Sequence, residues 1–221
     1  MKKLLYIPVN SKPENMSTSK TAGRYFVNRF MSENTDYTVE ELDLYNEYIP
    51  EPIYKYFKGR AELVTGAEYD SLSEFDKKAV DRMNQLSDQF LSADVYVIAA
   101  PMWSVSFPSI LKRYMDCIII NNKLIKISPE NVDGLLEDKQ RNMIYIQSSG
   151  GIYPKILGAN VNHGVDYFHD IFKFLGITRF QKVLIEGVDM PEVGKDKALQ
   201  MAYEEMETVI KKFSREPILK Q

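Results

Sequence analysis

Short apolar runs alternate with amphipathic stretches along this chain of 221 residues. The apolar runs are four to eight residues long and are typical of buried strands. They occupy residues 3–9, 37–44, 94–99, 142–147 and 180–186. The stretches between them carry apolar residues every three or four positions, which predicts helices that cover a sheet.

Helix signals separate the predicted strands. The clearest stripe consists of Leu72, Phe75, Ala79, Met83, Leu86 and Phe90. Ser71 and Glu74 stand three residues apart ahead of this stripe and predict a capping box at its start. Further helices are expected from Ala22, over 109–116, over 165–175 and from Ala198. Gly176 is a suitable residue to end the helix at 165–175.

Strands that alternate with helices predict an α/β fold, because parallel strands need crossover connections. We expect a flavodoxin-like three-layer sandwich: a five-stranded parallel sheet in the order 2-1-3-4-5 with helices on both faces. Residues 1–213 are expected to form one domain, with an excursion at about 45–70 that has no clear period. The tail 214–221 is expected to be disordered. The tyrosines of the excursion suit either a subunit interface or a cover over the sheet edge.

Composition narrows the function classes. The chain has 28 basic and 31 acidic residues and a net charge of −3, with no basic run, which argues against nucleic acid as a partner. No apolar stretch approaches the roughly 20 residues of a membrane span, so a cytoplasmic location is expected. The single cysteine, Cys117, excludes an internal disulfide and a cysteine metal cluster. It lies in an apolar run and is expected to be buried.

The loop after the third predicted strand carries the only tryptophan of the chain. Loops at the carboxyl ends of parallel strands form the ligand sites of open α/β sheets. This loop is stiff and apolar, which suits a planar ring, and its residues are Pro101, Met102, Trp103, Ser104 and Val105.

The loop after the first predicted strand is rich in hydroxyl groups and leads directly into a helix. Helix N-termini bind phosphate, and hydroxyl side chains add donors at the same place. The residues are Ser11, Ser17, Thr18 and Ser19. The loop lacks both the P-loop and the dinucleotide-binding glycine patterns, which favours a terminal monophosphate. The alternative is that these residues are ordinary helix caps.

The loop after the fourth predicted strand contains two adjacent glycines that would let the backbone approach a ligand closely. It consists of Ser148, Ser149, Gly150 and Gly151, and a plain turn is the alternative. All three loops should meet at one edge of the sheet. A phosphate site, a flat apolar ledge and a close backbone contact together indicate flavin mononucleotide (FMN).

These segments resemble the FMN-dependent NADH-azoreductase family, whose members also reduce quinones. The resemblance covers most of the chain and is strongest at 86–91, 100–104, 107–108, 150–153 and 186–187. It implies that the first loop holds the FMN phosphate, that residues 102–105 pack on the isoalloxazine ring, and that residues 148–151 line its pyrimidine side. It further implies NADH or NADPH as electron donor, quinone or azo substrates, ping-pong kinetics and a homodimer.

Two departures from the family pattern fall in the ring loop. Ser104 stands where the family usually has Asn, and Val105 where it usually has Phe. The family's Phe-x-Tyr segment, which helps to shape the substrate pocket, corresponds here to residues 124–127. Substrate preference is therefore the property that the resemblance predicts least well.

No catalytic side chain and no metal are expected, since the cofactor would carry the chemistry. His163 and His169 match no zinc spacing and suit structural or surface roles. The alternative for His163 is a position near the flavin as a proton donor to substrate. Two other functions stay open: a non-catalytic flavodoxin-like electron carrier and a flavin-free binding module. Colour of the purified protein and bleaching by NADH would separate the three.

Overall fold

A computed structural model describes residues 1–153 and 162–214 of the chain. Five parallel strands form its main sheet in the order β2-β1-β5-β8-β9. Counted along the sheet strands alone, this is the predicted order 2-1-3-4-5. The strands are β1 (Lys2–Pro8), β2 (Tyr37–Glu41), β5 (Val95–Pro101), β8 (Asn142–Ser148) and β9 (Arg179–Ile185).

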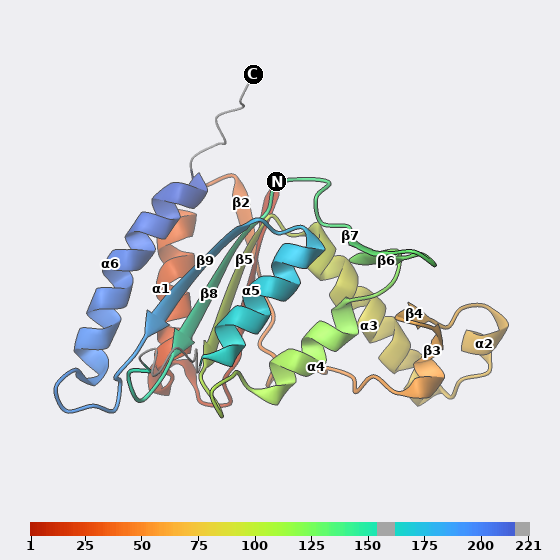
Figure 1. Cartoon of the computed structure of the whole chain (residues 1–221), viewed down its shortest axis with the longest axis horizontal. Helices are drawn as coiled ribbons and strands as arrows, with labels where there is room; N and C mark the ends of the chain where they lie inside the picture. The colour runs from red at the N-terminus through yellow and green to blue at the C-terminus, as the bar shows by residue number, and fades with distance from the viewer. Residues whose placement is uncertain (154–161, 215–221) are drawn as a thin grey trace, which may run out of the picture.

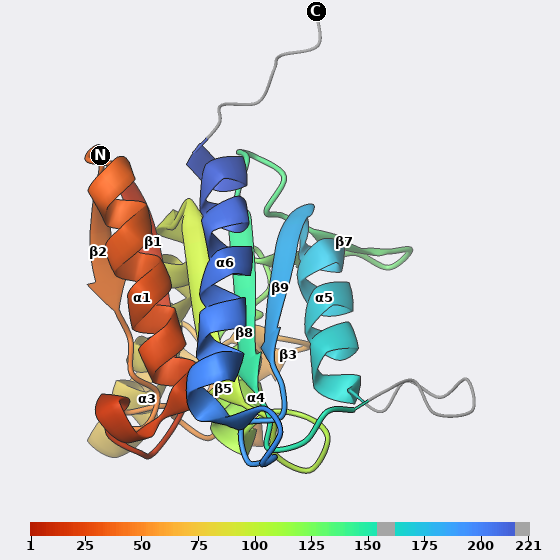
Figure 2. The same cartoon turned by 90° about the vertical axis from the view of Figure 1, so that its left-hand side faces the viewer.

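Helices cover both faces of the sheet and complete three layers. The helices α1 (Thr18–Glu33) and α6 (Gly194–Ser214) lie side by side on one face, as Figure 2 shows. The other face carries α3 (Glu74–Ser92), α4 (Ser109–Ile118) and α5 (His163–Leu175) (Figure 1). The flavodoxin-like three-layer architecture predicted from the alternation of strands and helices is therefore confirmed.

The central strand β5 explains why the sheet strands read as continuous apolar runs. Its residues Val95, Val97 and Ala99 belong to the core beneath α1 and α6. The alternate residues Tyr96 and Ile98 belong to the core on the opposite face. Because a parallel sheet is buried on both faces, both sets must be apolar.

The start of α3 differs from the prediction. The capping residue is Ser73, whose Oγ accepts the Asp76 N–H at 3.2 Å and donates to Asp76 Oδ2 at 2.6 Å. The inward position of this first turn is thus taken by Asp76, which also accepts hydrogen bonds from Lys55 and Tyr56. Phe75 consequently faces solvent, 69% exposed, and does not belong to the apolar stripe.

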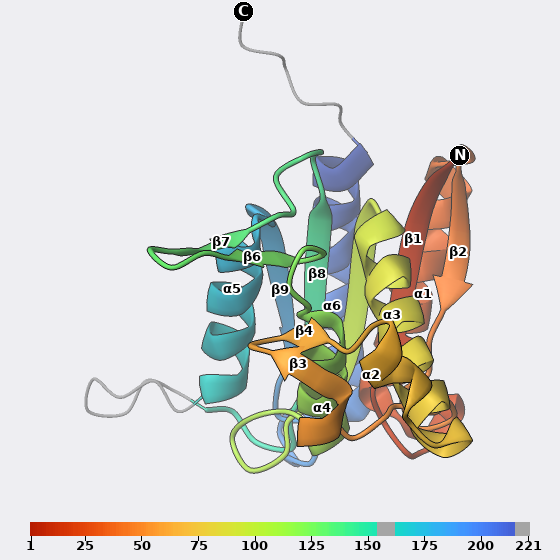
Figure 3. The same cartoon turned by 90° about the vertical axis from the view of Figure 1, so that its right-hand side faces the viewer.

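Small elements that the sequence analysis did not predict lie outside the helices of the second face (Figure 3). The excursion contains η2 (Tyr54–Tyr56), an antiparallel pair of β3 (Phe57–Gly59) and β4 (Glu62–Leu63), and α2 (Ala67–Asp70). A second antiparallel pair consists of β6 (Ile125–Ile127) and β7 (Val132–Gly134). A 3₁₀ turn, η1 (Glu14–Met16), precedes α1.

The final helix runs further than expected. Ser214, expected to belong to a disordered tail, is the last residue of α6, and its Oγ donates to the Ile210 carbonyl at 3.0 Å. Residues 215–221 lie outside the described part of the chain. Every helix within residues 1–153 and 162–214 is too short or too polar to cross a membrane.

Candidate functional site

A pocket lies at the edge of the sheet where the strands end. All strands of the main sheet are parallel, so the loops after β1, β5, β8 and β9 meet there (Figure 1). The empty space between them is about 680 Å³, open solvent included. It is lined by Asn10, Ser11, Lys12, Met16, Ser17, Thr18, Pro101, Met102, Trp103, Ser148, Ser149, Gly150, Val188 and Asp189.

The structure brings together most of the residues that the sequence predicted. Nine of the thirteen line the pocket, and they come from all three predicted loops. Ser19, Ser104, Val105 and Gly151 do not line it. Five lining residues were missed by the sequence analysis: Asn10, Lys12, Met16, Val188 and Asp189.

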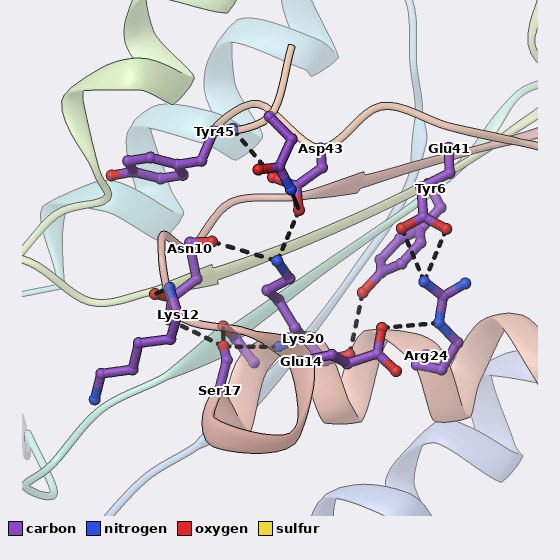
Figure 4. A network of polar contacts seen from close by, with 12 residues as sticks. Tyr6, Asn10, Lys12, Glu14, Ser17, Lys20, Arg24, Glu41, Asp43 and Tyr45 are labelled. Atoms are coloured by element: carbon purple, nitrogen blue, oxygen red, sulfur yellow. Dashed lines mark hydrogen bonds and ion pairs between the residues drawn. The ribbon is translucent and has the colours of Figure 1, made fainter.

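The first loop presents the N-terminus of α1 to the pocket (Figure 4). Ser17 caps the helix, and its buried Oγ accepts the Lys20 N–H at 3.3 Å and the Asn10 side-chain amide at 2.9 Å. Ser19 is fully buried, with its Oγ 3.3 Å from that of Ser17, so it lies behind the pocket wall. The first turn of a helix has N–H groups without intrahelical partners, and those of Thr18 and Ser19 find no acceptor in the described part of the chain. This end of the pocket suits an anion.

Asn10 and Lys12 complete the anion end. The Asn10 Oδ1 accepts the Lys12 N–H at 3.0 Å, while its amide donates to Ser17, so one side chain joins the loop to the helix start. Lys12 is the only basic residue between β1 and α1, and it lines the pocket. That position, between a strand and a helix N-terminus, was the sequence signal that could have identified it.

The ring loop presents a flat apolar wall and then turns sharply. Pro101, Met102 and Trp103 line the pocket. Trp103 and Ser106 exchange two backbone hydrogen bonds, of 3.1 and 2.9 Å, around the two-residue corner Ser104–Val105. The corner residues have φ angles of 50° and 55°, as a type I′ turn requires. This left-handed geometry is strained for a β-branched residue such as Val105.

A buried glutamine holds this turn in place from behind. Gln147, on β8 and 2% exposed, donates from Nε2 to the Ser106 carbonyl at 3.2 Å. Its Oε1 accepts the side-chain amide of Asn162 at 2.7 Å, and Asn162 caps α5. The turn also rests against Gly164, where an added Cβ would come within 2.9 Å of the Ser106 backbone.

The loop after β8 is joined by backbone hydrogen bonds to the loop after β9. Val188 N–H donates to the Ser149 carbonyl at 3.1 Å, and Asp189 N–H to the Gly150 carbonyl at 3.0 Å. The Asp189 carboxylate occupies the space that a Gly150 side chain would need. Asp189 is the only acidic residue lining the pocket within the described residues, and a carboxylate there accepts hydrogen bonds from hydroxyl or ring N–H groups.

Neither histidine lines the pocket. His163 is exposed at the first turn of α5, and His169 Nδ1 lies 3.3 Å from Asp170 Oδ1, with its ring against Phe180. Cys117 is buried, as predicted, and burial raises the pKa of its thiol to about 12. A thiol in that state is a poor nucleophile at neutral pH. Within residues 1–153 and 162–214, no group of three or more His, Cys, Asp or Glu side chains is arranged to hold a metal.

The residues present fit a flavin mononucleotide. The α1 N-terminus, the hydroxyls of Ser11 and Thr18 and the Lys12 ammonium suit a phosphate. The Pro101–Trp103 wall suits the face of a flat ring. The space beside Gly150 is taken by the Asp189 carboxylate, which suits the donor groups of a polyol or a pyrimidine edge.

Comparison with known proteins agrees with this reading of the pocket. A family model described as the flavodoxin-like fold matches residues 2–210. FMN-dependent NADH:quinone oxidoreductase 1 of Clostridium acetobutylicum is 52% identical over 221 residues, which is 100% of both chains. FMN-dependent NADH:quinone oxidoreductase of Clostridium botulinum is 48% identical over 95% of this chain and 98% of its own length. An FMN-dependent NADH-azoreductase from Bacillus anthracis, solved in complex with FMN, superposes with a TM-score of 0.84 at 28% identity, covering 97% of this chain and 100% of that one.

Proposed function

The chain belongs to the flavodoxin-like fold family, and from that membership we propose that it is an FMN-dependent NADH:quinone oxidoreductase that also reduces azo compounds. The single observation that carries the proposal is the convergence of a helix N-terminus, an apolar wall and the loop Ser148–Gly150 in one pocket. When bound, FMN supplies the two-electron chemistry, accepting hydride from NADH and passing the electron pair to a quinone, which also takes up two protons.

The residues of the pocket bind and orient the cofactor. Ser11, Lys12 and the N-terminus of α1 with Ser17, Thr18 and the backbone of Ser19 would hold the phosphate. Pro101, Met102 and Trp103 would hold the ring, and Ser104 and Val105 form the turn that follows them. Ser148, Ser149 and Gly150, followed by Gly151 outside the lining, would hold the pyrimidine side, with Asp189 as acceptor for its donor groups. We assign no general acid or base to a side chain, and His163 does not line the pocket.

Access explains the order of the reaction. NADH and the acceptor would occupy the same place in this one pocket in turn, and ping-pong kinetics follow. We propose NADH as donor because the relatives named above use it, and a quinone or azo acceptor for the same reason.

The test uses the purified full-length chain. We expect it to be yellow, to release one FMN per chain on denaturation, and to lose its colour when NADH is added without oxygen. A menaquinone analogue such as 2-methyl-1,4-naphthoquinone should restore the colour. A yellow protein that NADH does not bleach would be an electron carrier, and a colourless protein that does not take up FMN would be a flavin-free binding module. Either result would overturn the proposal.

We also propose that the protein is a cytoplasmic homodimer. Large apolar side chains of the loops after β5 and β8 are exposed, and an interface would cover them. They include Val105 at 38%, Ile152 at 49% and Tyr153 at 41% exposure. Light scattering coupled to size exclusion should give twice the chain mass of 25.6 kDa, and a monomer at micromolar concentration would contradict the homodimer.

A further inference from the structure

A second aromatic ring stands beside Trp103, just outside the lining of the pocket. Tyr45 follows β2, and its ring centroid lies 6.4 Å from that of Trp103, with an angle of 64° between the planes. The two side chains are 37% and 45% exposed, so both present ring surface to solvent. Trp103 lines the pocket and Tyr45 does not. Tyr45 therefore extends the apolar wall outward, beyond the space proposed for FMN.

The position of Tyr45 is set by Asp43 (Figure 4). The Asp43 Oδ1 accepts the Tyr45 N–H at 3.0 Å, and Oδ2 accepts the Asn46 side-chain amide at 3.0 Å. The Asp43 carbonyl accepts the N–H groups of Asn46 and Glu47, both at 3.0 Å. Asp43 thus folds the chain back on itself directly after β2, and the turn places Tyr45 beside Trp103.

Asp43 is in turn anchored to the anion end of the pocket. Its Oδ2 accepts from Lys20 Nζ at 2.7 Å, and the side chains of these residues are only 14% and 8% exposed. Lys20 lies in the first turn of α1, and its Nζ also donates to the Asn10 carbonyl at 3.4 Å. Separating a largely buried ion pair leaves an uncompensated charge, which is strongly unfavourable. The Tyr45 turn is therefore fixed to the loop that we assign to the phosphate.

We propose, building on the function proposed above, that Tyr45 is a specificity-determining residue for the electron acceptor and that Asp43 is its positioning residue. Tyr45 and Trp103 form two walls that meet at an angle, and a fused-ring acceptor is held by stacking on one ring and edge contact with the other. The acceptors that these two rings would favour are therefore planar aromatic quinones of two or more rings. Tyr45 adds no binding energy for acceptors that lack an aromatic face.

The test compares acceptors on the FMN-loaded enzyme. Tyr45→Ala should raise the KM for 2-methyl-1,4-naphthoquinone by about two- to tenfold, the range expected for one ring contact. The KM for ferricyanide, the rate of bleaching by NADH and the Kd for FMN should stay unchanged. Tyr45→Phe keeps the ring and should retain the wild-type KM. Tyr54→Ala is the matched control, because Tyr54 lies in the same excursion, is 94% exposed and has no ring partner among the described residues.

Asp43→Asn provides a second and independent arm. It keeps the size of the side chain and an oxygen for the Tyr45 N–H, but replaces Oδ2 by an amide group that can accept from neither Lys20 nor Asn46. The turn loses these anchors, so the naphthoquinone KM should rise, by no more than in Tyr45→Ala and with no further rise in the double variant. The Kd for FMN should stay equal or fall, because a carboxylate no longer neutralises the Lys20 ammonium beside the phosphate loop. A variant that only weakened the fold would raise both constants.

Several results would overturn the inference. Tyr45→Ala could leave the naphthoquinone KM unchanged, raise the KM of ferricyanide to the same extent, or raise the Kd for FMN and shift the flavin absorption spectrum. The last result would make Tyr45 part of the flavin site. If Asp43→Asn fails to fold, Tyr45→Ala alone decides, since it alters a half-exposed side chain. All of these outcomes presuppose bleaching by NADH, so they are distinct from a failure of the proposed function.

Discussion

Val105 occupies a backbone position that disfavours its own side chain. Its φ of 55° lies in the left-handed region, where the backbone conformation of a non-glycine residue costs about 1–2 kcal/mol of conformational energy. Such strain persists only where the surroundings impose it. Here the Trp103–Ser106 hydrogen bonds and Gln147 do so from both sides.

Replacement of Val105 by glycine should therefore stabilise the protein. Glycine adopts the left-handed region freely, but it loses about 0.5–1 kcal/mol more backbone entropy on folding, which leaves a net gain of about 0.5–1 kcal/mol. Chemical denaturation of the cofactor-free protein measures the change in the free energy of unfolding. Val39 is equally exposed, at 38%, but lies in the strand β2, so Val39→Gly should destabilise. Destabilisation by both variants would show that the turn is not strained.

The space beside Gly150 is taken by a neighbouring side chain. A Cβ on Gly150 would meet the Asp189 carboxylate, which is the exposed end of a flexible side chain and can turn away, so Gly150→Ala should lower the free energy of unfolding by less than about 1 kcal/mol. The adjacent Gly151 has 3.7 Å of clearance to Tyr153, and Gly151→Ala should have little effect. Asp189→Ala in the Gly150→Ala background should restore most of the loss. Without that rescue, the contact with Asp189 would not be the reason for the glycine.

At the scale of elements, the Glu207 carboxylate on α6 links this helix to α1 through hydrogen bonds. Glu207 accepts hydrogen bonds from Arg29 Nε at 2.9 Å and from the Tyr25 hydroxyl at 2.8 Å, and Tyr25 stacks on Tyr203 with centroids 3.9 Å apart. The hydrogen bond from Arg29, followed by that from Tyr25, lowers the pKa of Glu207 from 4.5 to about 2. This polar contact between the two helices should therefore weaken when acid protonates Glu207.

The pH dependence of stability follows from the direction of that shift. A lowered pKa in the folded state means that the ionised Glu207 stabilises the fold above pH 4.5 and that this contribution is lost as the pH falls toward about 2. Because the side chain is 30% exposed, the pair contributes only about 0.5–1 kcal/mol at pH 7. Glu207→Gln should lower Tm at pH 7 and flatten the decline of Tm below pH 4.5. Glu204→Gln, at an exposed position of the same helix, should not, and equal effects of the two variants would contradict this role for Glu207.

The start of α3 shows what local sequence can and cannot decide. Two serines, Ser71 and Ser73, each precede an acidic residue by three positions, so the sequence contains two candidate caps. Ser73 is used because Asp76 turns inward to Lys55 and Tyr56, which come from the excursion. The choice between the two caps depends on contacts with residues about 20 positions away, so the sequence near the caps cannot predict it.

For the whole molecule, the alternation of strands and helices was sufficient to predict the sheet order and the meeting of three loops. Parallel topology forces the loops after β1, β5 and β8 to one edge, so the nine lining residues among those predicted followed from chain order alone. The contribution of Val188 and Asp189 could not be predicted in this way. It depends on backbone hydrogen bonds between the loops after β8 and β9, and the spacing of apolar residues in the sequence does not predict such bonds. The three-residue strands β6 and β7 are likewise too short to show a period.

The pocket draws on four loops, from Asn10 near the start of the chain to Asp189 near its end. A ligand that contacts all four loops can bind only after the strands of the sheet have assembled, because only then do the loops lie together. The unfolded chain has no comparable affinity for it. Binding and folding are then one coupled equilibrium: at 100 times its Kd, a ligand adds about 2.7 kcal/mol to the stability of the native state. In a cell, the supply of that ligand would set the lifetime of the polypeptide against proteolysis as well as the fraction that is active.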